Sequence, residues 1–108
     1  MLALIEVIDG GIGNSIQDSG RLGFRHMGIT VSGWIDPMLA RCANALVGNE
    51  ANSACIEIRG AGPTLVARDG RFRMVLTGDI TATLKREFGQ AREVPPWTSF
   101  TLEANDTL

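Results

Sequence analysis

The sequence lacks the features of several large protein classes. No apolar run approaches the ~18 residues that a membrane-spanning helix needs, and residues 1–6 lack the basic start of a signal peptide. Ten Lys and Arg residues against twelve Asp and Glu residues leave no broad basic surface for nucleic acid or acidic membranes. We therefore expect a cytoplasmic protein with no nucleic-acid or membrane partner.

Cysteine and histidine are also scarce, with two cysteines and one histidine in 108 residues. Cys42 and Cys55 do not form a Cys-x-x-Cys motif, so we interpret them as buried thiols in a reducing compartment. A metal site is not predicted, because no close cluster of ligands exists. His26 has aromatic and apolar neighbours and no visible Ser or Cys partner, which favours a structural role over a general base.

The residues that are present predict a single β-rich domain. A short aliphatic run that stops at Asp9-Gly10-Gly11 indicates a strand at 2–8, and a period of two after Ser53 indicates strands at 54–59, 64–68, 71–77, 80–85 and 98–103. Residues 12–17 are predicted to pair back on the first strand, and the later strands to pair with their neighbours in sequence. Asp69-Gly70 is a strong signal for a hairpin turn. The charged stretch 85–93 is interpreted as a solvated hairpin extension, since its charges nearly cancel.

One clear helix is predicted at about 36–47. Asp36 can cap its first amides, and a proline in the first turn loses no hydrogen bond. The apolar residues Leu39, Cys42, Ala43 and Leu46 then repeat with helical spacing, and Gly48 is a suitable end. The predicted fold class is therefore β-rich α+β.

The most unusual stretch is residues 17–37, a long segment without a sustained period in which glycines and polar groups gather. Long ordered loops of this kind are often functional. Its apolar residues predict that the loop lies against the body of the domain.

The candidate site residues in and after this stretch each have a structural and a functional interpretation. Asp18 and Arg21 are expected to form an ion pair across a turn or to bind a ligand. Asp36 is most simply a helix cap, and Asn44 is placed to satisfy loop backbone. Ser32 supplies a hydroxyl beside these groups. No nucleophile elbow, P-loop or zinc motif accompanies them.

The motifs resemble a known family. Their order is Gln17-Asp18-x-Gly20-Arg21-x-Gly23, Gly28-Ile29-x-Val31-Ser32-Gly33-x-x-Asp36, Ala43-Asn44-x-Leu46-Val47-Gly48-Asn49, Glu57, Gly62-Pro63 and Leu76-Thr77-Gly78. This string is similar to the first half of the KipA family, also called allophanate hydrolase subunit 2, the C subunit of 5-oxoprolinase or the biotin-dependent carboxyltransferase A/B domain. The stretch 85–93 is longer and more charged than the family pattern.

The resemblance implies a cyclophilin-like antiparallel β-barrel, with residues 1–108 as the N-terminal subdomain and without the second, similar subdomain. It implies ATP-dependent opening of 5-oxoproline to glutamate with a KipI-type partner subunit. The alternatives are the carboxyltransferase of a biotin-dependent urea carboxylase and a non-catalytic module that binds a KipI-like kinase inhibitor. A prolyl isomerase role would rest on fold analogy alone.

The same resemblance bears on the site and its cofactors. ATP or biotin is implied for the whole complex only, since the chain has no recognisable motif for either. Asp18, Arg21, Ser32, Asp36 and Asn44 are the predicted site architecture around a small amide substrate, although no catalytic residue is assigned. We expect no catalysis from this chain alone, because a site shared between subdomains or subunits would be incomplete.

Overall fold

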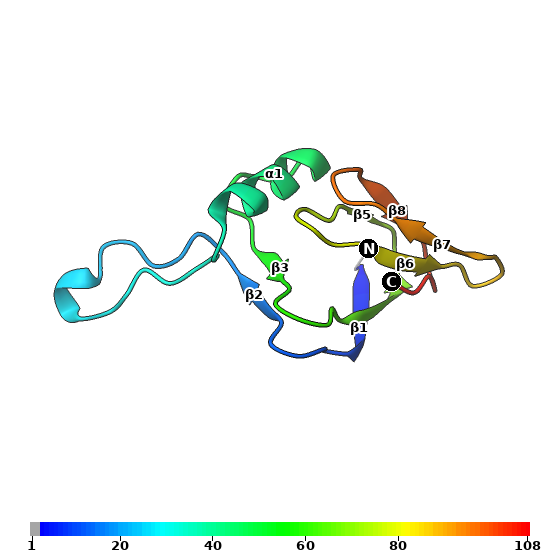
Figure 1. The fold of residues 1–108 in the computed structure, drawn as a ribbon, viewed down its shortest axis with the longest axis horizontal. Coiled ribbons are helices and arrows are strands. Elements are labelled where there is room, and N and C mark those ends of the chain that lie inside the picture. The colour runs from blue at the N-terminus through cyan, green and yellow to red at the C-terminus, as the bar shows by residue number, and fades with distance from the viewer. Residues whose placement is uncertain (1–2) are drawn as a thin grey trace.

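The computed structural model describes residues 3–108, which form eight short strands, one α-helix and one 3-10 turn (Figure 1). The strands are β1 (Leu4–Asp9), β2 (Ser15–Gln17), β3 (Cys55–Glu57), β4 (Thr64–Asp69), β5 (Phe72–Met74), β6 (Ala82–Lys85), β7 (Ala91–Val94) and β8 (Phe100–Leu102). The helices are η1 (Arg25–Met27) and α1 (Pro37–Val47). The predicted β-rich fold with one main helix is confirmed. No helix in this described part of the chain is long and apolar enough to cross a bilayer.

The strand pairing is nested rather than sequential, which corrects two expectations. β1 pairs with β4 and encloses β2 with β3, while β5 pairs with β8 and encloses β6 with β7, all antiparallel. Residues 12–17 therefore do not pair with the first strand, because their partner is β3. Of the later strands, only β6 and β7 are paired neighbours in sequence. Gly70, at φ +80°, still turns the chain, but β4 and β5 on either side of it have different partners.

The last residues of the chain join the two halves. Thr107 bridges Val66 of β4 and Lys85 of β6. Leu65 and Leu108 exchange backbone hydrogen bonds of 2.9 and 2.8 Å, and Lys85 and Thr107 exchange bonds of 2.8 and 2.9 Å. These bonds produce one sheet in the order β1, β4, residues 106–108, β6, β7. A closed barrel is not seen among residues 3–108, since β2–β3 and β5–β8 are separate two-stranded sheets.

The hydrophobic core lies mainly in the second half of the chain. Its buried members are Ala67, Leu84, Val94, Phe100 and Leu102. Beneath the β6–β7 hairpin, the buried carboxylate of Asp106 pairs with Arg86 and accepts the Glu103 amide at 2.8 Å. The predicted hairpin extension at 85–93 is confirmed, and its Phe88 is 94% exposed.

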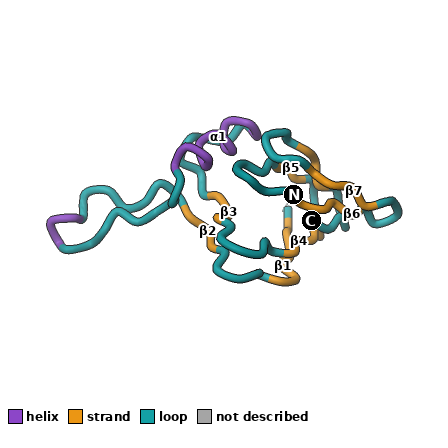
Figure 2. Tube along the Cα trace, viewed as in Figure 1, coloured by secondary structure: helices purple, strands orange, loops and turns teal. Residues whose placement is uncertain are grey.

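Residues 18–33 project from the body as an arm with η1 at its tip, as the tube drawing also shows (Figure 2). This corrects the expectation that apolar residues hold the loop against the domain. Leu22, Phe24 and Met27 are exposed instead. For 108 residues a compact chain has a radius of gyration of about 13 Å, whereas this chain has 15.1 Å.

Candidate functional site

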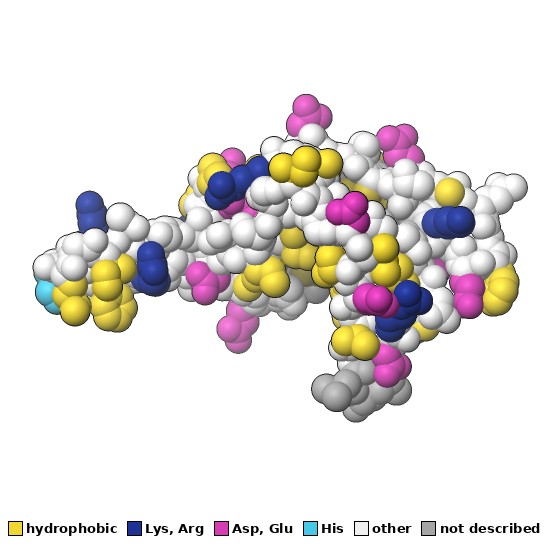
Figure 3. All heavy atoms as spheres, turned by 90° about the horizontal axis from the view of Figure 1, so that it is seen from below, with side chains coloured by type: hydrophobic (Ala, Val, Ile, Leu, Met, Phe, Trp, Pro, Cys, Tyr) yellow, Lys and Arg dark blue, Asp and Glu magenta, His cyan; other side chains and the backbone are white. Residues whose placement is uncertain are grey.

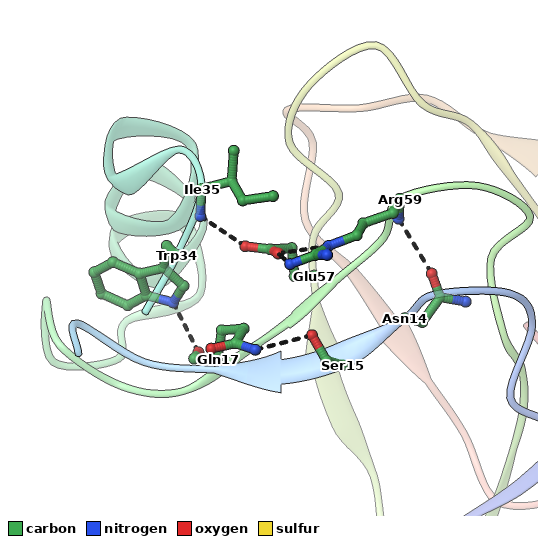
Figure 4. Close-up of polar contacts among 7 residues, drawn as sticks. All are labelled: Asn14, Ser15, Gln17, Trp34, Ile35, Glu57 and Arg59. Atoms are coloured by element: carbon green, nitrogen blue, oxygen red, sulfur yellow. Dashed lines mark hydrogen bonds and ion pairs between the residues drawn. The ribbon is translucent and has the colours of Figure 1, made fainter. Parts of the chain in front are cut away.

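The arm leaves the body at a junction made by residues 14–18, 34–36 and 57–59, drawn in Figure 4. Trp34 is buried there. Its indole Nε1 donates to the Gln17 carbonyl at 2.7 Å, and its backbone N–H donates to the Asp18 carbonyl at 3.0 Å. The Arg41 guanidinium lies 6.0 Å from the centre of the indole ring, within cation–π range. These contacts fix the direction in which the arm leaves the domain.

Glu57 connects the junction to the sheet. Its Oε2 accepts the Ile35 N–H at 2.8 Å, and its Oε1 pairs with Nη2 of Arg59 at 3.1 Å (Figure 4). The Glu57 side chain is 14% exposed, so the carboxylate is largely shielded and matched by an N–H and a guanidinium. The Arg59 backbone N–H in turn donates to Oδ1 of Asn14 at 3.2 Å. Arg59 lies at a bend two residues beyond the end of β3, and the ion pair places its side chain on the same side as that of Glu57.

Helix α1 begins at this junction as predicted. The Asp36 carboxylate accepts the Leu39 N–H at 3.1 Å, and Pro37 fills the first turn. At the other end, Gly48 adopts a left-handed conformation at φ +80° and its N–H bonds to Asn44 and Ala45 carbonyls. Both boundary signals read from the sequence are therefore confirmed.

A cleft of about 1230 Å³ runs from this junction across the middle of the domain. One face of α1 forms one wall, β3 and residues 58–64 form the next, and residues 73–83 and 107–108 complete it. The predicted buried helix face is only partly buried, since Leu39, Cys42 and Ala43 are half-buried and Leu46 is exposed. Leu39 and Ala43 line the cleft. The fully enclosed residues of the helix are Ala40 and Asn44.

The cleft carries charges of both signs. Asp36, Glu57 and Asp79 supply carboxylates. Its cations are Arg59, Arg73 and Lys85. Arg73 is oriented by hydrogen bonds to Thr101 Oγ1 at 3.0 Å and Ser99 Oγ at 2.7 Å. Guanidinium groups held in this way can stabilise a carboxylate or a developing oxyanion.

The structure separates the five predicted site residues into two groups. Asp36 and Asn44 line the cleft. Asp18, Arg21 and Ser32 lie on the arm, outside the cleft lining. Their role in chemistry stays a prediction.

Within the arm, the expected ion pair is replaced by other contacts. No Asp18–Arg21 pair forms in the described structure. Asp18 Oδ1 accepts the Gly20 N–H at 2.9 Å, and Arg21 Nη2 donates to Ser32 Oγ at 3.0 Å. Ser32 has φ +55°, an uncommon conformation for a residue other than glycine.

The Asn44 side chain donates hydrogen bonds to backbone carbonyls of the loop after α1, which is the structural role predicted for it. Its Nδ2 donates to the carbonyls of Ser53 and Ala51 at 2.9 and 3.2 Å, and its Oδ1 accepts from the Cys55 thiol at 3.6 Å. The residue is 2% exposed. Burial raises the pKa of the Cys55 thiol, and the hydrogen bond with Asn44 opposes that rise.

The cleft cations Arg59 and Arg73 were not among the predicted site residues. Two signals in the sequence point to them: Glu57-x-Arg59 on one face of an extended segment, and Arg73 within a short strand of otherwise apolar residues. Neither signal identifies the cleft, because the two arginines lie on separate segments that line one cleft only in the folded chain.

The fold and the cleft define a small β-rich α+β module whose helix and sheets surround an open, mixed-charge cleft. A family model described as "Carboxyltransferase domain, subdomain A and B" matches residues 27–108. The chain belongs to this carboxyltransferase domain family.

Three relatives show how much of a longer protein this chain represents. It is 44% identical over 55 residues to the 5-oxoprolinase C subunit of Escherichia coli, a match that covers 51% of this chain and 18% of the relative. It is 30% identical over 105 residues to urea amidolyase of Saccharomyces cerevisiae, covering 96% of this chain and 5% of the relative. The crystal structure of TTHA0988 superimposes with a TM-score of 0.80 at 33% identity, covering 97% of this chain and 20% of that chain. The chain therefore spans a fifth or less of each of these relatives.

Proposed function

We propose that this chain is the N-terminal subdomain of a 5-oxoprolinase-type subunit, which acts with a KipI-type partner in the ATP-dependent opening of 5-oxoproline to glutamate. The observation that carries the proposal is the 44% identity to the 5-oxoprolinase C subunit of Escherichia coli. A second protein of that name, from Haemophilus influenzae, is 39% identical over 62 residues.

The proposed reaction requires a site that stabilises negative charge in the transition state. Water adds to the ring carbonyl of the cyclic amide, the C–N bond breaks, and the nitrogen leaves as an amine after taking a proton. Negative charge develops on the carbonyl oxygen in the transition state, where fixed cations and N–H groups stabilise it. In this chain, Arg59 and Arg73 are the cations that suit such a role, and they also suit the carboxylate of the substrate.

A phosphate site for ATP does not fit the start of α1. Helix N-termini bind phosphate through free amides. Here Asp36 places a carboxylate on the first turn, and Pro37 has no N–H. We therefore assign no step at this helix to ATP, which on this proposal binds elsewhere in the complex.

One observation favours a second candidate, the carboxyltransferase of a biotin-dependent urea carboxylase. The match to urea amidolyase extends over 96% of this chain, whereas the match to the 5-oxoprolinase C subunit covers about half. Carboxyl transfer to an amide nitrogen also develops oxyanion charge. The two candidates therefore make similar use of the cleft and differ in the co-substrate.

The test is an activity assay of the chain in its full-length context with the KipI-type subunit. We expect glutamate to appear from 5-oxoproline only with ATP. We also expect Arg59→Gln and Arg73→Gln each to lower the rate by roughly a hundredfold, the lower end of the range for a lost oxyanion contact. Arg68→Gln is the matched control, because Arg68 pairs with Glu6 on β1 outside the cleft lining.

The outcomes separate the candidates. Carboxyl transfer to urea without opening of 5-oxoproline would replace the first candidate with the second. Stable binding of the KipI-type subunit without either reaction would indicate a binding module. An equal loss of rate in the Arg68 control would show that the cleft arginines have no special role.

A further inference from the structure

The ion pair between Glu57 and Arg59 differs from the other ion pairs in the described part of the chain, because both of its members line the cleft. The Glu57 side chain is 14% exposed, whereas that of Arg59 is 53% exposed. In the Glu6–Arg68 pair, both side chains are open to solvent, at 50% and 44%. The cleft pair therefore combines a shielded carboxylate with an accessible guanidinium.

Contacts from separate segments hold this pair in place. Oε2 of Glu57 accepts the Ile35 N–H at 2.8 Å, just before the start of α1. The Arg59 backbone N–H donates to Oδ1 of Asn14 at 3.2 Å, and Nδ2 of Asn14 donates to two backbone carbonyls at 2.9 and 2.8 Å. Figure 4 shows the Glu57 carboxylate between Ile35 and the Arg59 guanidinium. An arginine held in this way loses less conformational freedom when it contacts a ligand.

The Arg59 guanidinium keeps donors for such a ligand. A guanidinium carries five N–H groups. Oε1 of Glu57 accepts from Nε at 3.2 Å and from Nη2 at 3.1 Å. The remaining N–H groups, both on Nη1 and the second on Nη2, have no acceptor among residues 3–108. Glu57 therefore occupies one edge of the guanidinium and leaves the terminal edge free, which can donate from both nitrogens to an anionic group.

The second cleft arginine, Arg73, is arranged differently. Its Nη1 donates to Thr101 Oγ1 at 3.0 Å, and its Nη2 donates to Ser99 Oγ at 2.7 Å. Both terminal nitrogens of Arg73 thus already contact protein hydroxyls. Arg59 is the cleft arginine whose Nη1 has no such contact in the described structure.

We propose that Glu57 is a positioning residue, which holds the Arg59 guanidinium so that its free terminal edge contacts an anionic oxygen of the substrate in the cleft. Glu57 acts through Arg59, because its own two oxygens accept from Arg59 and from the Ile35 N–H. The identity of the substrate rests on the function proposed above. The positioning of Arg59 by Glu57 does not.

The first test measures how fast arginine Nε–H groups exchange with water, by NMR of the full-length protein with isotope-labelled arginine. Arg59→Gln identifies the Arg59 signal by its loss. Glu57→Gln keeps the size of the side chain and removes its charge. We expect this variant to speed exchange at Arg59 by at least about tenfold, because a charge-assisted hydrogen bond is lost. The Nε–H of Arg68, which pairs with Glu6, should be unchanged and is the control signal.

The second test measures kcat and KM for 5-oxoproline in the complex with the KipI-type subunit and ATP. Glu57→Gln should lower kcat/KM by roughly ten- to a hundredfold, since a contact group is displaced, and should change the same constant that Arg59→Gln changes. The double variant should be within about twofold of Arg59→Gln alone, because a positioning residue has no effect once the group that it positions is absent. Glu6→Gln is the matched control and should keep the parent rate, since Glu6 pairs with Arg68 outside the cleft lining.

The arm supplies a reference for an unpaired arginine. Figure 3 shows basic side chains on the arm and no acidic side chain at its tip. Arg25 is exposed and forms no ion pair within the described residues. Its Nε–H should therefore exchange much faster than that of Arg59 in the parent protein.

Several outcomes would overturn the inference. Unchanged exchange at Arg59 in Glu57→Gln is one, and losses of rate that multiply in the double variant are another, because they would indicate a structural role for Glu57. If circular dichroism shows that Glu57→Gln is unfolded, the parent decides: an Arg59 Nε–H that exchanges as fast as that of Arg25 would overturn the inference. A parent that does not open 5-oxoproline would contradict the proposed function, and the exchange rates would still decide whether Glu57 positions Arg59.

Discussion

Residues 4–69 and residues 72–102 share one pairing scheme, an outer strand pair around an inner pair, but they use it differently. In the second half, a short turn at 86–90 joins the inner strands, and the side chains close over a core. In the first half, the inner strands β2 and β3 are also paired, but the arm, α1 and the loop to residue 54 lie between them in the sequence (Figure 1). With this long segment between β2 and β3, the first half lines an open cleft. Ala67 is the one residue of the first half in the main core cluster.

The comparison shows that the main core and the five predicted site residues lie mostly in different parts of the chain, whereas the cleft is lined by both halves. The second half holds most of the fully buried apolar side chains. The first half holds all five predicted site residues, at polar positions with local hydrogen bonds. A substitution in the main core should therefore affect folding, and one on the exposed arm should affect a binding property.

The largest expected effect comes from matched truncations of apolar side chains in the two regions. Leu84 is 0% exposed in the core, whereas Met27 is 65% exposed on the arm. We expect Leu84→Ala to lower the free energy of unfolding by about 2–5 kcal/mol, through lost transfer energy and a cavity. Met27→Ala should change it by less than about 0.5 kcal/mol for the monomer. Urea denaturation at a concentration where the chain is monomeric measures both, and similar losses for both variants would contradict the division between the halves.

The sequence predicted the helix well because the relevant signals are local. Asp36, Pro37 and Gly48 act within one turn of their own position, so no distant contact is needed to interpret them. Alternation in residues 64–68 and 80–85 likewise indicated strands. It did not indicate partners, because an alternating strand is compatible with any neighbour that offers a matching face.

The errors came from long-range structure. The Asp69-Gly70 pair does turn the chain, but β4 and β5 on its two sides pair with β1 and β8. The arm was misplaced because apolar residues such as Phe24 predict burial without specifying what covers them. The cleft arginines were missed because Arg59 and Arg73 lie on separate segments that line one cleft only in the folded chain.

An intermediate effect should come from the buried amide that stabilises the first half. Asn44→Ala leaves the carbonyls of Ala51 and Ser53 without their donor, which should cost about 1–3 kcal/mol of unfolding free energy. Asn49→Ala is the matched control, since Asn49 is an exposed residue just after the same helix. Urea denaturation again measures the difference. An equal, small effect for the two asparagines would show that Asn44 does not hold the loop to the helix.

The smallest effect on stability is expected at the polar contact of the arm, where a binding role can be separated from a structural one. Arg21 donates to Ser32, and both residues are exposed, so Arg21→Ala should change the unfolding free energy by less than about 0.5 kcal/mol. If Arg21 contacts a substrate or a partner, the same variant should still lose activity or association in the full-length complex. Arg21→Lys keeps the positive charge but loses the planar guanidinium. Activity or association equal to the parent in Arg21→Lys would indicate simple charge attraction. A loss equal to that of Arg21→Ala would indicate a bidentate contact. Unchanged activity and association in Arg21→Ala would remove this residue from the candidate site and leave the cleft, lined by both halves of the chain, as the remaining candidate.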